Sequence, residues 1–162
     1  MKKYTAYKIT NIPWIRMVPE HWTVSRGKKV FFTQKQKNNG LQINNILSLT
    51  LKGVIHNYAN SPIGLAPSDY STYQIFEPGD LVFKLIDLNN IATSRVGLVP
   101  EEGIMSSAYI RLTPRKEINI QYYFLQYYDL WLRQIYNGLG NGVRQTLNAD
   151  DLLNIWLNLN FS

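Results

Sequence analysis

The sequence predicts an α+β fold, built as a single domain around a mixed or antiparallel twisted β-sheet core with a few helices. In the middle of the chain, short apolar runs alternate with Gly, Pro, Asn and Asp turn signals, as in hairpin-forming strands. After Pro114 the pattern changes to a long stretch without helix breakers, rich in Leu and aromatic residues. A length of 162 residues, without a repeat or a linker, fits one domain spanning residues 1–162.

The N-terminal segment has no clear periodicity. Residues 11–22 contain Pro13 and Pro19, which oppose a long helix and favour extended or turn backbone before them. We therefore expect an irregular segment whose Trp and Ile side chains pin it to the core. Over residues 24–35 the apolar residues recur at roughly helical spacing, which predicts a short helix. Residues 35–40 are expected to form a polar, basic loop.

Strands dominate the middle of the chain. Turn signals at Lys52-Gly53 and at residues 77–80 separate runs that alternate apolar and polar residues or are largely apolar. In the last run, Ala108, Ile110 and Leu112 are expected on one face of the strand, with Tyr109 and Arg111 on the other. The strands predicted from these runs span residues 46–51, 81–86, 92–99 and 106–113.

A long helix is the clearest element of the C-terminal third. Residues 120–136 contain no breaker and many aromatic and Leu residues. The glycine-rich run 138–142 is expected to stop this helix, because glycine accepts the left-handed backbone found at helix C-termini. The sequence then predicts an extended piece over 143–147, a turn of helix from Asn148 or Ala149 to Leu153, and a strand over 155–160.

The composition predicts a basic, soluble protein of the cytoplasm. The 17 Lys and Arg residues against 11 Asp and Glu give a formal net charge of +6, with a pI near 9.5. Such a charge attracts phosphate backbones or anionic membrane surfaces. The lack of Cys removes disulfides and thiolate metal sites, which fits a reducing compartment. No apolar window approaches about 18 residues, so no membrane span is expected.

Motifs of catalytic and cofactor-binding sites are missing from the sequence. His21 and His56 lack metal-ligand spacing, so we expect no metal site. Glycines 138–142 follow a helix rather than a strand, and no Gly-Lys-Ser or Gly-Lys-Thr ending exists, which excludes a P-loop. The glycine turn of a nucleotide-binding methyltransferase is not visible either. We therefore predict a chain that is not an enzyme and binds no cofactor itself.

Two other functions stay open from the residues alone. Asp80 and Lys84 share one predicted strand and come nearest to the carboxylate–lysine set of a Mg²⁺-dependent nuclease, although Val82 stands where such a site carries Glu. The aromatic helix over 122–136 is compatible with a module that docks a partner protein, although aromatic residues at helical spacing more often pack in a core. Mg²⁺-dependent cleavage, or a lack of DNA affinity, would favour these alternatives in turn.

Residue types that read DNA gather in four predicted loops. Arg and Lys pair with guanine in the major groove, and Asn and Gln pair with adenine. Some of the cations are expected to touch only phosphates. By composition alone, DNA contact and ordinary solvated loops are about equally supported. The candidate DNA-binding residues are Lys35, Lys37, Asn38, Asn39, Thr50, Lys52, Asn89, Asn90, Thr93, Ser94, Arg95, Arg144, Gln145 and Thr146.

Four motifs follow one another along the chain. They are Ile12-Pro13 through Trp22, Pro78 to Leu85 with Asn90 to Ala92, Ser106 to Tyr109, and Gly138 to Leu147 leading into Asp150 to Ile155. The ordered series resembles a target recognition domain of the specificity subunit of type I restriction-modification systems. That family opens with IP..W, continues with a GDLLF.K......G strand and loop, and closes with G....R..L....L..I..P. The closing proline is missing here, where the chain has Trp156 to Leu159.

The resemblance implies a role and a set of partners. It implies sequence-specific binding of double-stranded DNA, which directs modification and restriction subunits to a bipartite site. The catalysis, S-adenosylmethionine, ATP and Mg²⁺ would belong to those subunits. Complete specificity subunits carry two recognition domains joined by long spacer helices, whereas residues 1–162 match one domain without a spacer. We therefore expect pairing with a second recognition domain or with a second copy.

Overall fold

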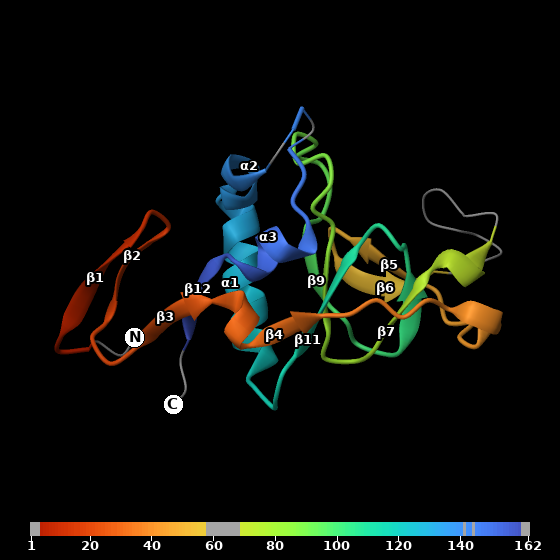
Figure 1. The fold of residues 1–162 in the computed structure, drawn as a ribbon, viewed down its shortest axis with the longest axis horizontal. Coiled ribbons are helices and arrows are strands. Elements are labelled where there is room, and N and C mark those ends of the chain that lie inside the picture. Colours follow the sequence, from red (N-terminus) through yellow and green to blue (C-terminus); the bar gives the residue numbers. More distant parts are fainter. Residues whose placement is uncertain (1–3, 58–68, 141, 144, 160–162) are drawn as a thin grey trace.

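The computed structural model describes residues 4–57, 69–140, 142–143 and 145–159, and the molecule is elongated (Figure 1). A strand hairpin near the N-terminus lies at one end, the long helix and a four-stranded sheet lie in the middle, and two strand pairs lie at the other end. All ladders between the described strands are antiparallel. The predicted α+β fold class is thereby confirmed.

The N-terminal segment is a β-hairpin, so the prediction of an irregular stretch was wrong. β1 (Tyr7–Ile12) pairs with β2 (Ile15–Pro19). Pro13 lies in the connecting turn and Pro19 is the last residue of β2, where Tyr7 faces it. A proline at a strand end removes no central hydrogen bond from the ladder. The two prolines therefore bound a strand instead of preventing one.

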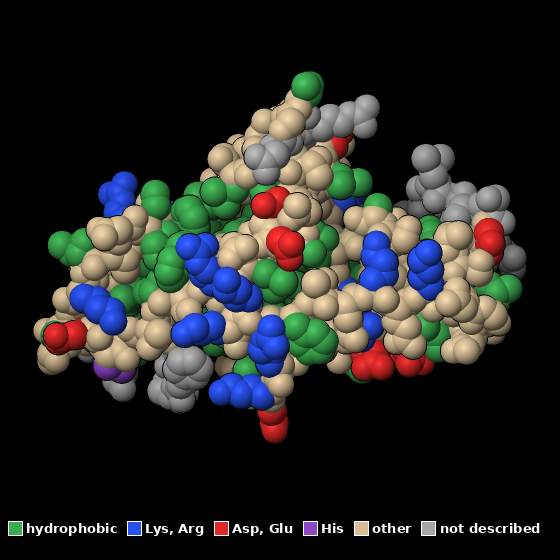
Figure 2. All heavy atoms as spheres, viewed as in Figure 1, with side chains coloured by type: hydrophobic (Ala, Val, Ile, Leu, Met, Phe, Trp, Pro, Cys, Tyr) green, Lys and Arg blue, Asp and Glu red, His purple; other side chains and the backbone are tan. Residues whose placement is uncertain are grey.

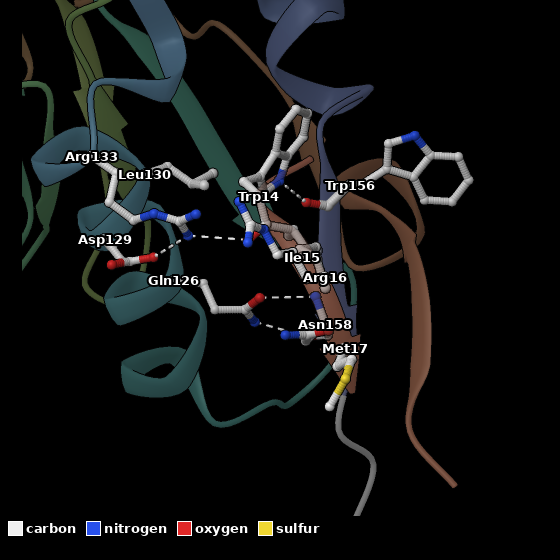
Figure 3. Close-up of a pocket in the computed structure, with 11 residues that line it drawn as sticks. Trp14, Ile15, Arg16, Met17, Gln126, Asp129, Leu130, Arg133, Trp156 and Asn158 are labelled. Carbon is white, nitrogen blue, oxygen red and sulfur yellow. Dashed lines mark hydrogen bonds and ion pairs between the residues drawn. The ribbon is translucent and has the colours of Figure 1, made fainter. Parts of the chain in front are cut away.

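Trp14 attaches this hairpin to the body, as the sequence predicted for its Trp and Ile side chains. Its indole packs against the main core, and Ile15 beside it is buried. Trp14 Nε1 donates to the carbonyl of Trp156 at 3.2 Å, and Arg133 Nη1 donates to the carbonyl of Trp14 at 3.1 Å. Figure 3 shows these residues around a hollow of about 200 Å³ between β2, the long helix and the last strand.

The helix predicted over residues 24–35 was also wrong. This stretch forms β3 (Thr23–Arg26), a 3₁₀ turn η1 (Gly27–Lys29) and β4 (Phe31–Thr33). Long-range pairing decides its conformation, because β3 pairs with β12 (Trp156–Leu159) and β4 pairs with β11 (Ile110–Pro114). Its Val, Phe and Thr residues fit a half-buried pleated surface well. A spacing of three or four residues over one turn could not reveal these distant partners.

The central sheet has the strand order β4–β11–β8–β9. β8 (Leu81–Phe83) is buried throughout, as predicted, but it ends three residues before the predicted strand 81–86. β9 (Val96–Leu98) and β11 start later than predicted, because residues 91–93 and 107–109 are turns or bends. Arg111 and Leu112 are both buried, so the polar face predicted for Arg111 is covered by the protein.

Two strand pairs lie beyond the central sheet. β5 (Leu47–Thr50) and β6 (Gly53–His56) form the hairpin expected around Lys52-Gly53. β7 (Gln74–Phe76) pairs with β10 (Gly103–Met105), and the sequence patterns had predicted neither strand. Short 3₁₀ turns, η2 (Asn39–Leu41) and η3 (Tyr70–Thr72), flank this end. A separate apolar cluster that includes Phe76, Val82 and Met105 joins these pairs to the central sheet.

The long helix α1 (Ile120–Leu132) confirms most of the helix predicted over 120–136. Its inner face buries Tyr123, Tyr127 and Leu130 in the main core. The helix breaks at Gln134, whose φ of 55° is left-handed, and α2 (Ile135–Leu139) follows. The left-handed residue is therefore a glutamine, and Gly138 lies inside α2, contrary to the prediction of a glycine stop.

The last two elements agree with the sequence. α3 (Ala149–Leu153) begins after Asn148, whose side chain accepts from the Asp151 amide at 2.8 Å while the Asp151 carboxylate accepts from the Asn148 amide at 3.0 Å. This reciprocal pair is a capping box. β12 follows as the closing strand.

In the described part of the chain, no helix has the length and apolar character needed to cross a bilayer.

Candidate nucleic-acid interface

A groove of about 420 Å³ opens between the β5–β6 hairpin and the end of β8. The segment that leads into β11 forms its other wall. Its lining mixes hydroxyl, amide, aromatic and aliphatic side chains with one cation. The lining residues are Leu47, Ser48, Leu49, Thr50, Asn57, Tyr73, Lys84, Ile86, Ser106, Ala108 and Tyr109. We call this surface the groove.

The groove presents neutral phenols and one ammonium group. Burial raises the pKa of Tyr73, with smaller contributions from neighbouring tyrosines, and burial raises the pKa of Tyr109. Both phenols are therefore protonated donors at neutral pH, and their rings offer flat apolar faces. Lys84 is half-buried and supplies the positive charge. These groups can contact phosphates, base edges and base faces.

A buried glutamine holds one wall of the groove in place. Gln74 Nε2 donates to the carbonyls of Ser106 at 3.1 Å and Tyr109 at 2.6 Å. Its side chain is fully buried behind the lining. Lys35 braces the same segment from outside, because its Nζ donates to the carbonyl of Ser107 at 2.6 Å. The first predicted loop therefore borders the groove directly.

The loop over residues 35–39 divides into exposed and buried candidates. Lys35, Lys37 and Asn39 are exposed. Asn38 is fully buried, and its amide bonds both backbone groups of Ile43 at 2.9 Å, accepting from N–H and donating to the carbonyl. Both bonds fix the turn around η2. Asn38 is therefore a structural residue, and its assignment as a DNA contact was wrong.

The second loop is the tight turn between β5 and β6. Thr50 Oγ1 donates to the carbonyl of Gly53 at 2.9 Å and accepts from the Lys52 amide at 3.1 Å. Gly53 has a φ of 99°, which favours glycine at that position. Thr50 lines the groove while its hydroxyl serves the turn, and Lys52 projects exposed from the tip.

The third loop is organised around Arg95, which is buried. Its Nη1 donates to the carbonyls of Lys84 at 3.1 Å and Ile86 at 3.0 Å. Its Nη2 donates to the carbonyls of Asp87 at 2.9 Å and Asn90 at 2.6 Å. Burial lowers the pKa of Arg95, and Asp87 opposes this shift. All four acceptors lie in the segment that leaves the groove.

Burial corrects two of the assignments in this loop. Arg95 is 3% exposed and Ser94 is 4% exposed, so neither can contact DNA in this conformation. Arg95 instead holds the loop in shape, and other side chains of the loop form its exposed surface. Asn89 and Asn90 are exposed, and Thr93 is half-buried.

The fourth loop packs against the third. The Leu88 amide donates to the carbonyl of Gln145 at 3.2 Å, and Asn89 Nδ2 donates to the carbonyl of Val143 at 3.1 Å. Residues 142, 143 and 145 form turns, and Gln145 has a φ of 54°, so the extended piece predicted over 143–147 is not formed at Val143 and Gln145, whereas Thr146 lies in a β-bridge. Gln145 and Thr146 are half-buried. Arg144 lies outside the described residues.

The four loops therefore form a connected surface. Lys35 touches the groove wall, Thr50 lines the groove, and Ile86 leads from the groove into the third loop. The fourth loop is bonded to the third. Apart from Thr50, the sequence missed the lining residues, including Tyr73, Lys84 and Tyr109, as parts of this surface. Their common signal is a position just outside a buried strand, which becomes informative only once the strand pairing is known.

The carboxylate proposed for a nuclease is engaged inside the protein. Asp80 Oδ2 accepts from Arg111 Nε at 2.6 Å and from the Glu77 amide at 2.8 Å. Asp80 Oδ1 accepts from Thr113 Oγ1 at 2.9 Å. Among the described residues, no group of three His, Asp or Glu side chains could hold a metal ion. Asp80 thus forms hydrogen bonds that stabilise the sheet, while Lys84 lines the groove.

Comparison with known proteins relates this architecture to a solved structure. The chain matches no protein-family model and no curated protein. It is similar to the crystal structure of the HsdS subunit from Thermoanaerobacter tengcongensis, with a TM-score of 0.50 and 16% sequence identity. The two chains share a fold. The similarity covers 94% of this chain and 36% of the HsdS chain, so this chain spans about a third of that protein's length.

Proposed function

We propose that this chain is the target recognition domain of a type I restriction-modification specificity subunit, and that it binds double-stranded DNA sequence-specifically without catalysing a reaction. The observation that carries the proposal is the fold shared with HsdS over 94% of the chain. The ordered motifs along the sequence suggest the same family. The connected surface of loops around the groove supplies the chemistry that base recognition needs.

In this proposal the groove and its flanking loops meet the major groove of DNA. Exposed Lys35, Lys37 and Lys52 bind phosphates or guanine, and the amides of exposed Asn39, Asn89 and Asn90 pair with adenine. Inside the groove, Lys84 with Tyr73 and Tyr109 contacts the approaching strand. Thr50, Thr93, Gln145 and Thr146 remain candidates on half-buried positions. Asn38, Ser94 and Arg95 position the loops from below.

The proposed role assigns the chemistry to partner subunits. The domain directs a methyltransferase subunit and a restriction subunit to a bipartite site in the cytoplasm. S-adenosylmethionine, ATP and Mg²⁺ are bound by those partners. A second recognition domain, or a second copy of this chain, reads the other half of the site. Two linked half-sites raise the overall affinity well above that of one half alone.

The alternatives receive less support from the side chains. A nuclease needs a free carboxylate, whereas Asp80 is bonded to Arg111, Thr113 and Glu77. The aromatic residues of α1 lie in the main core or pack against it. Tyr123 and Tyr127 pack in the core, as expected for a core helix, so they are not available to dock a partner.

Binding to a randomised pool of duplexes tests the proposal. We expect fluorescence anisotropy to show salt-sensitive binding, and selection of bound duplexes to enrich a short motif. Lys84→Gln should weaken binding by about tenfold and change the enriched motif, since it removes the only cation among the described residues of the groove lining. Lys8→Gln is the matched control, because it removes one exposed charge from β1, outside the groove. A wild-type chain that binds no duplex even at low salt would refute the proposed function.

A further inference from the structure

A group of cations lies outside the four loops that the sequence singled out. Arg26 ends β3, Lys28 and Lys29 lie in η1, and Arg115 and Lys116 directly follow β11. The two segments lie side by side, because the Arg115 amide donates to the carbonyl of Val30 at 2.8 Å. Figure 2 shows Lys and Arg side chains gathered over β3 and β4 on this face. We call these five residues the basic strip.

The charges of the basic strip face solvent. Lys28, Lys29, Arg115 and Lys116 are exposed, and Arg26 is half-buried with its guanidinium 4.6 Å above the Trp156 ring. Arg115 Nε donates to the carbonyl of Lys28 at 2.8 Å, which holds two of the cations together. Neither Lys28 nor Lys29 is within ion-pair distance of a carboxylate in the described part of the chain. Glu117 is the only acid within the two segments 26–29 and 115–117.

Five positive charges close together repel one another. Such a surface gains most from a polyanion, whose regularly spaced phosphates can meet several cations at once. A single small anion would neutralise one or two of them. The strip follows the chain rather than closing into a pocket, so its shape fits an extended backbone rather than a compact ligand.

The basic strip also continues toward the groove. β4 follows η1 directly, and the chain then reaches Lys35, which bonds the groove wall at Ser107. From Arg26 to Lys35 the fully extended chain would span at most about 30 Å, which is less than the roughly 34 Å of one turn of B-DNA. The strip and the groove wall are therefore no farther apart than one turn of a duplex.

We propose that the basic strip binds the phosphate backbone of double-stranded DNA and orients the duplex so that the groove meets the base edges. This inference rests on the proposed function and assigns a separate task within it. The strip supplies affinity without sequence information, whereas the groove and its loops supply the preference for a sequence. The two tasks can be separated by experiment.

The test compares two double variants over a series of salt concentrations. Lys28→Gln/Lys29→Gln removes two charges from the strip, and Lys8→Gln/Arg16→Gln removes two exposed charges from the β1–β2 hairpin as the matched control. For the strip variant we expect the slope of log K against log salt to become shallower by about 1.8, at roughly 0.9 per lost phosphate contact. Affinity at low salt should fall on the order of tenfold, with the enriched motif unchanged.

Two results would overturn the inference while the proposed function stands. The slope of the strip variant could equal that of the hairpin control, or the enriched motif could change in the strip variant. Circular dichroism of both variants checks that they remain folded. Failure of the wild-type chain to bind any duplex would instead remove the proposed function itself.

Discussion

Two regions of this molecule bury large polar side chains in opposite ways. In the aromatic region, α1 packs Tyr123 and Tyr127 against Phe31 and Phe83, with ring centroids 5.0 to 6.0 Å apart. In the arginine region, on the other side of the sheet and in the loop before β9, Arg111 and Arg95 are only 2% and 3% exposed. The first region buries neutral phenols, and the second buries charge.

The two regions differ in the interactions that hold their buried side chains in place. The phenols stay neutral, so apolar contact and edge-to-face ring geometry suffice to hold them. A buried guanidinium instead requires acceptors for its N–H groups. Arg111 bonds the carboxylate of Asp80, which directly precedes the neighbouring strand β8, and Arg95 bonds four carbonyls of one loop. Loss of an acceptor should therefore cost more in the arginine region than loss of a hydroxyl in the aromatic region.

The largest effect is expected for Asp80→Asn. The change leaves the buried guanidinium of Arg111 without its carboxylate 2.6 Å away and should lower the free energy of unfolding by about 3–5 kcal/mol. Glu77→Gln is the control, because Glu77 is 59% exposed and 3.9 Å from Arg111, where a pair contributes no more than about 1 kcal/mol. Urea unfolding measures both. Equal losses in the two variants would contradict the assignment of Asp80 as the main partner.

High pH should act on the aromatic region. Burial raises the pKa of Tyr127 and of Tyr136, and it raises the pKa of Tyr122 to about 12. An unfolded tyrosine has a pKa near 10, so above this pH the unfolded chain releases protons that the folded chain retains. The free energy of unfolding should stay constant with respect to these groups below pH 10 and fall as the pH rises from 10 toward 12.

The measurement follows tyrosinate absorbance and circular dichroism together. Each tyrosine that stays protonated in the folded chain contributes a slope of about 1.4 kcal/mol per pH unit in that window. We expect the buried tyrosines to ionise together as the protein unfolds. Gradual ionisation near pH 10 without loss of structure would show that these phenols are exposed to solvent.

The sequence predicted the aromatic region well because its pattern is local. Residues 120–136 contain no helix breaker and many aromatic and Leu residues, so the helix that the structure shows over 120–132 could be predicted from neighbouring residues. The turn of helix predicted from Asn148 or Ala149 to Leu153 is α3, and its capping pair, Asn148 and Asp151, is also local, since the two residues are three positions apart. The β5–β6 turn was also set by neighbouring residues.

The arginine region and the groove could not be predicted, because their contacts join residues that are far apart in the sequence. Asp80 and Arg111 are 31 positions apart, and nothing near either residue shows that β8 pairs with β11. Arginine is a residue type that reads DNA, so the sequence suggested Arg95 as a contact. Only the structure shows that Arg95 is buried and bonds carbonyls instead. The strand partners of 24–35 lie more than 75 positions away, so a helical spacing there was misleading.

A smaller effect tests how tightly the aromatic region is packed. A Cβ on Gly27 would lie 2.6 Å from the hydroxyl oxygen of Tyr127, with the next atoms at 3.6 Å. Gly27→Ala should therefore destabilise the protein by about 1–3 kcal/mol through overpacking. Tyr127→Phe removes a hydroxyl that has no partner among the described residues and should change stability by less than about 1 kcal/mol.

The double variant decides whether this contact is the cause. Without the hydroxyl, the added methyl group meets only ordinary contacts, so Tyr127→Phe should restore most of the stability lost in Gly27→Ala. Thermal unfolding of the four proteins completes the cycle. Additive losses would mean that Gly27 is needed for its backbone rather than for the space it leaves.

A small effect on stability, but the most informative effect for function, is expected for Arg95→Lys. Lysine keeps the positive charge but lacks the planar fork that reaches four carbonyls, so about 1–2 kcal/mol should be lost. The consequence should be local: amide exchange should accelerate in residues 86–95, and the enriched DNA motif should become less defined while the salt dependence of binding is kept. Asp80→Asn, compared at a temperature where both variants are folded, should leave the motif intact. If Arg95→Lys made the enriched motif less defined without faster amide exchange in the loop, Arg95 would have to leave its carbonyls and contact DNA itself. The distinction between buried supporting residues and exposed DNA contacts at this surface would then be wrong.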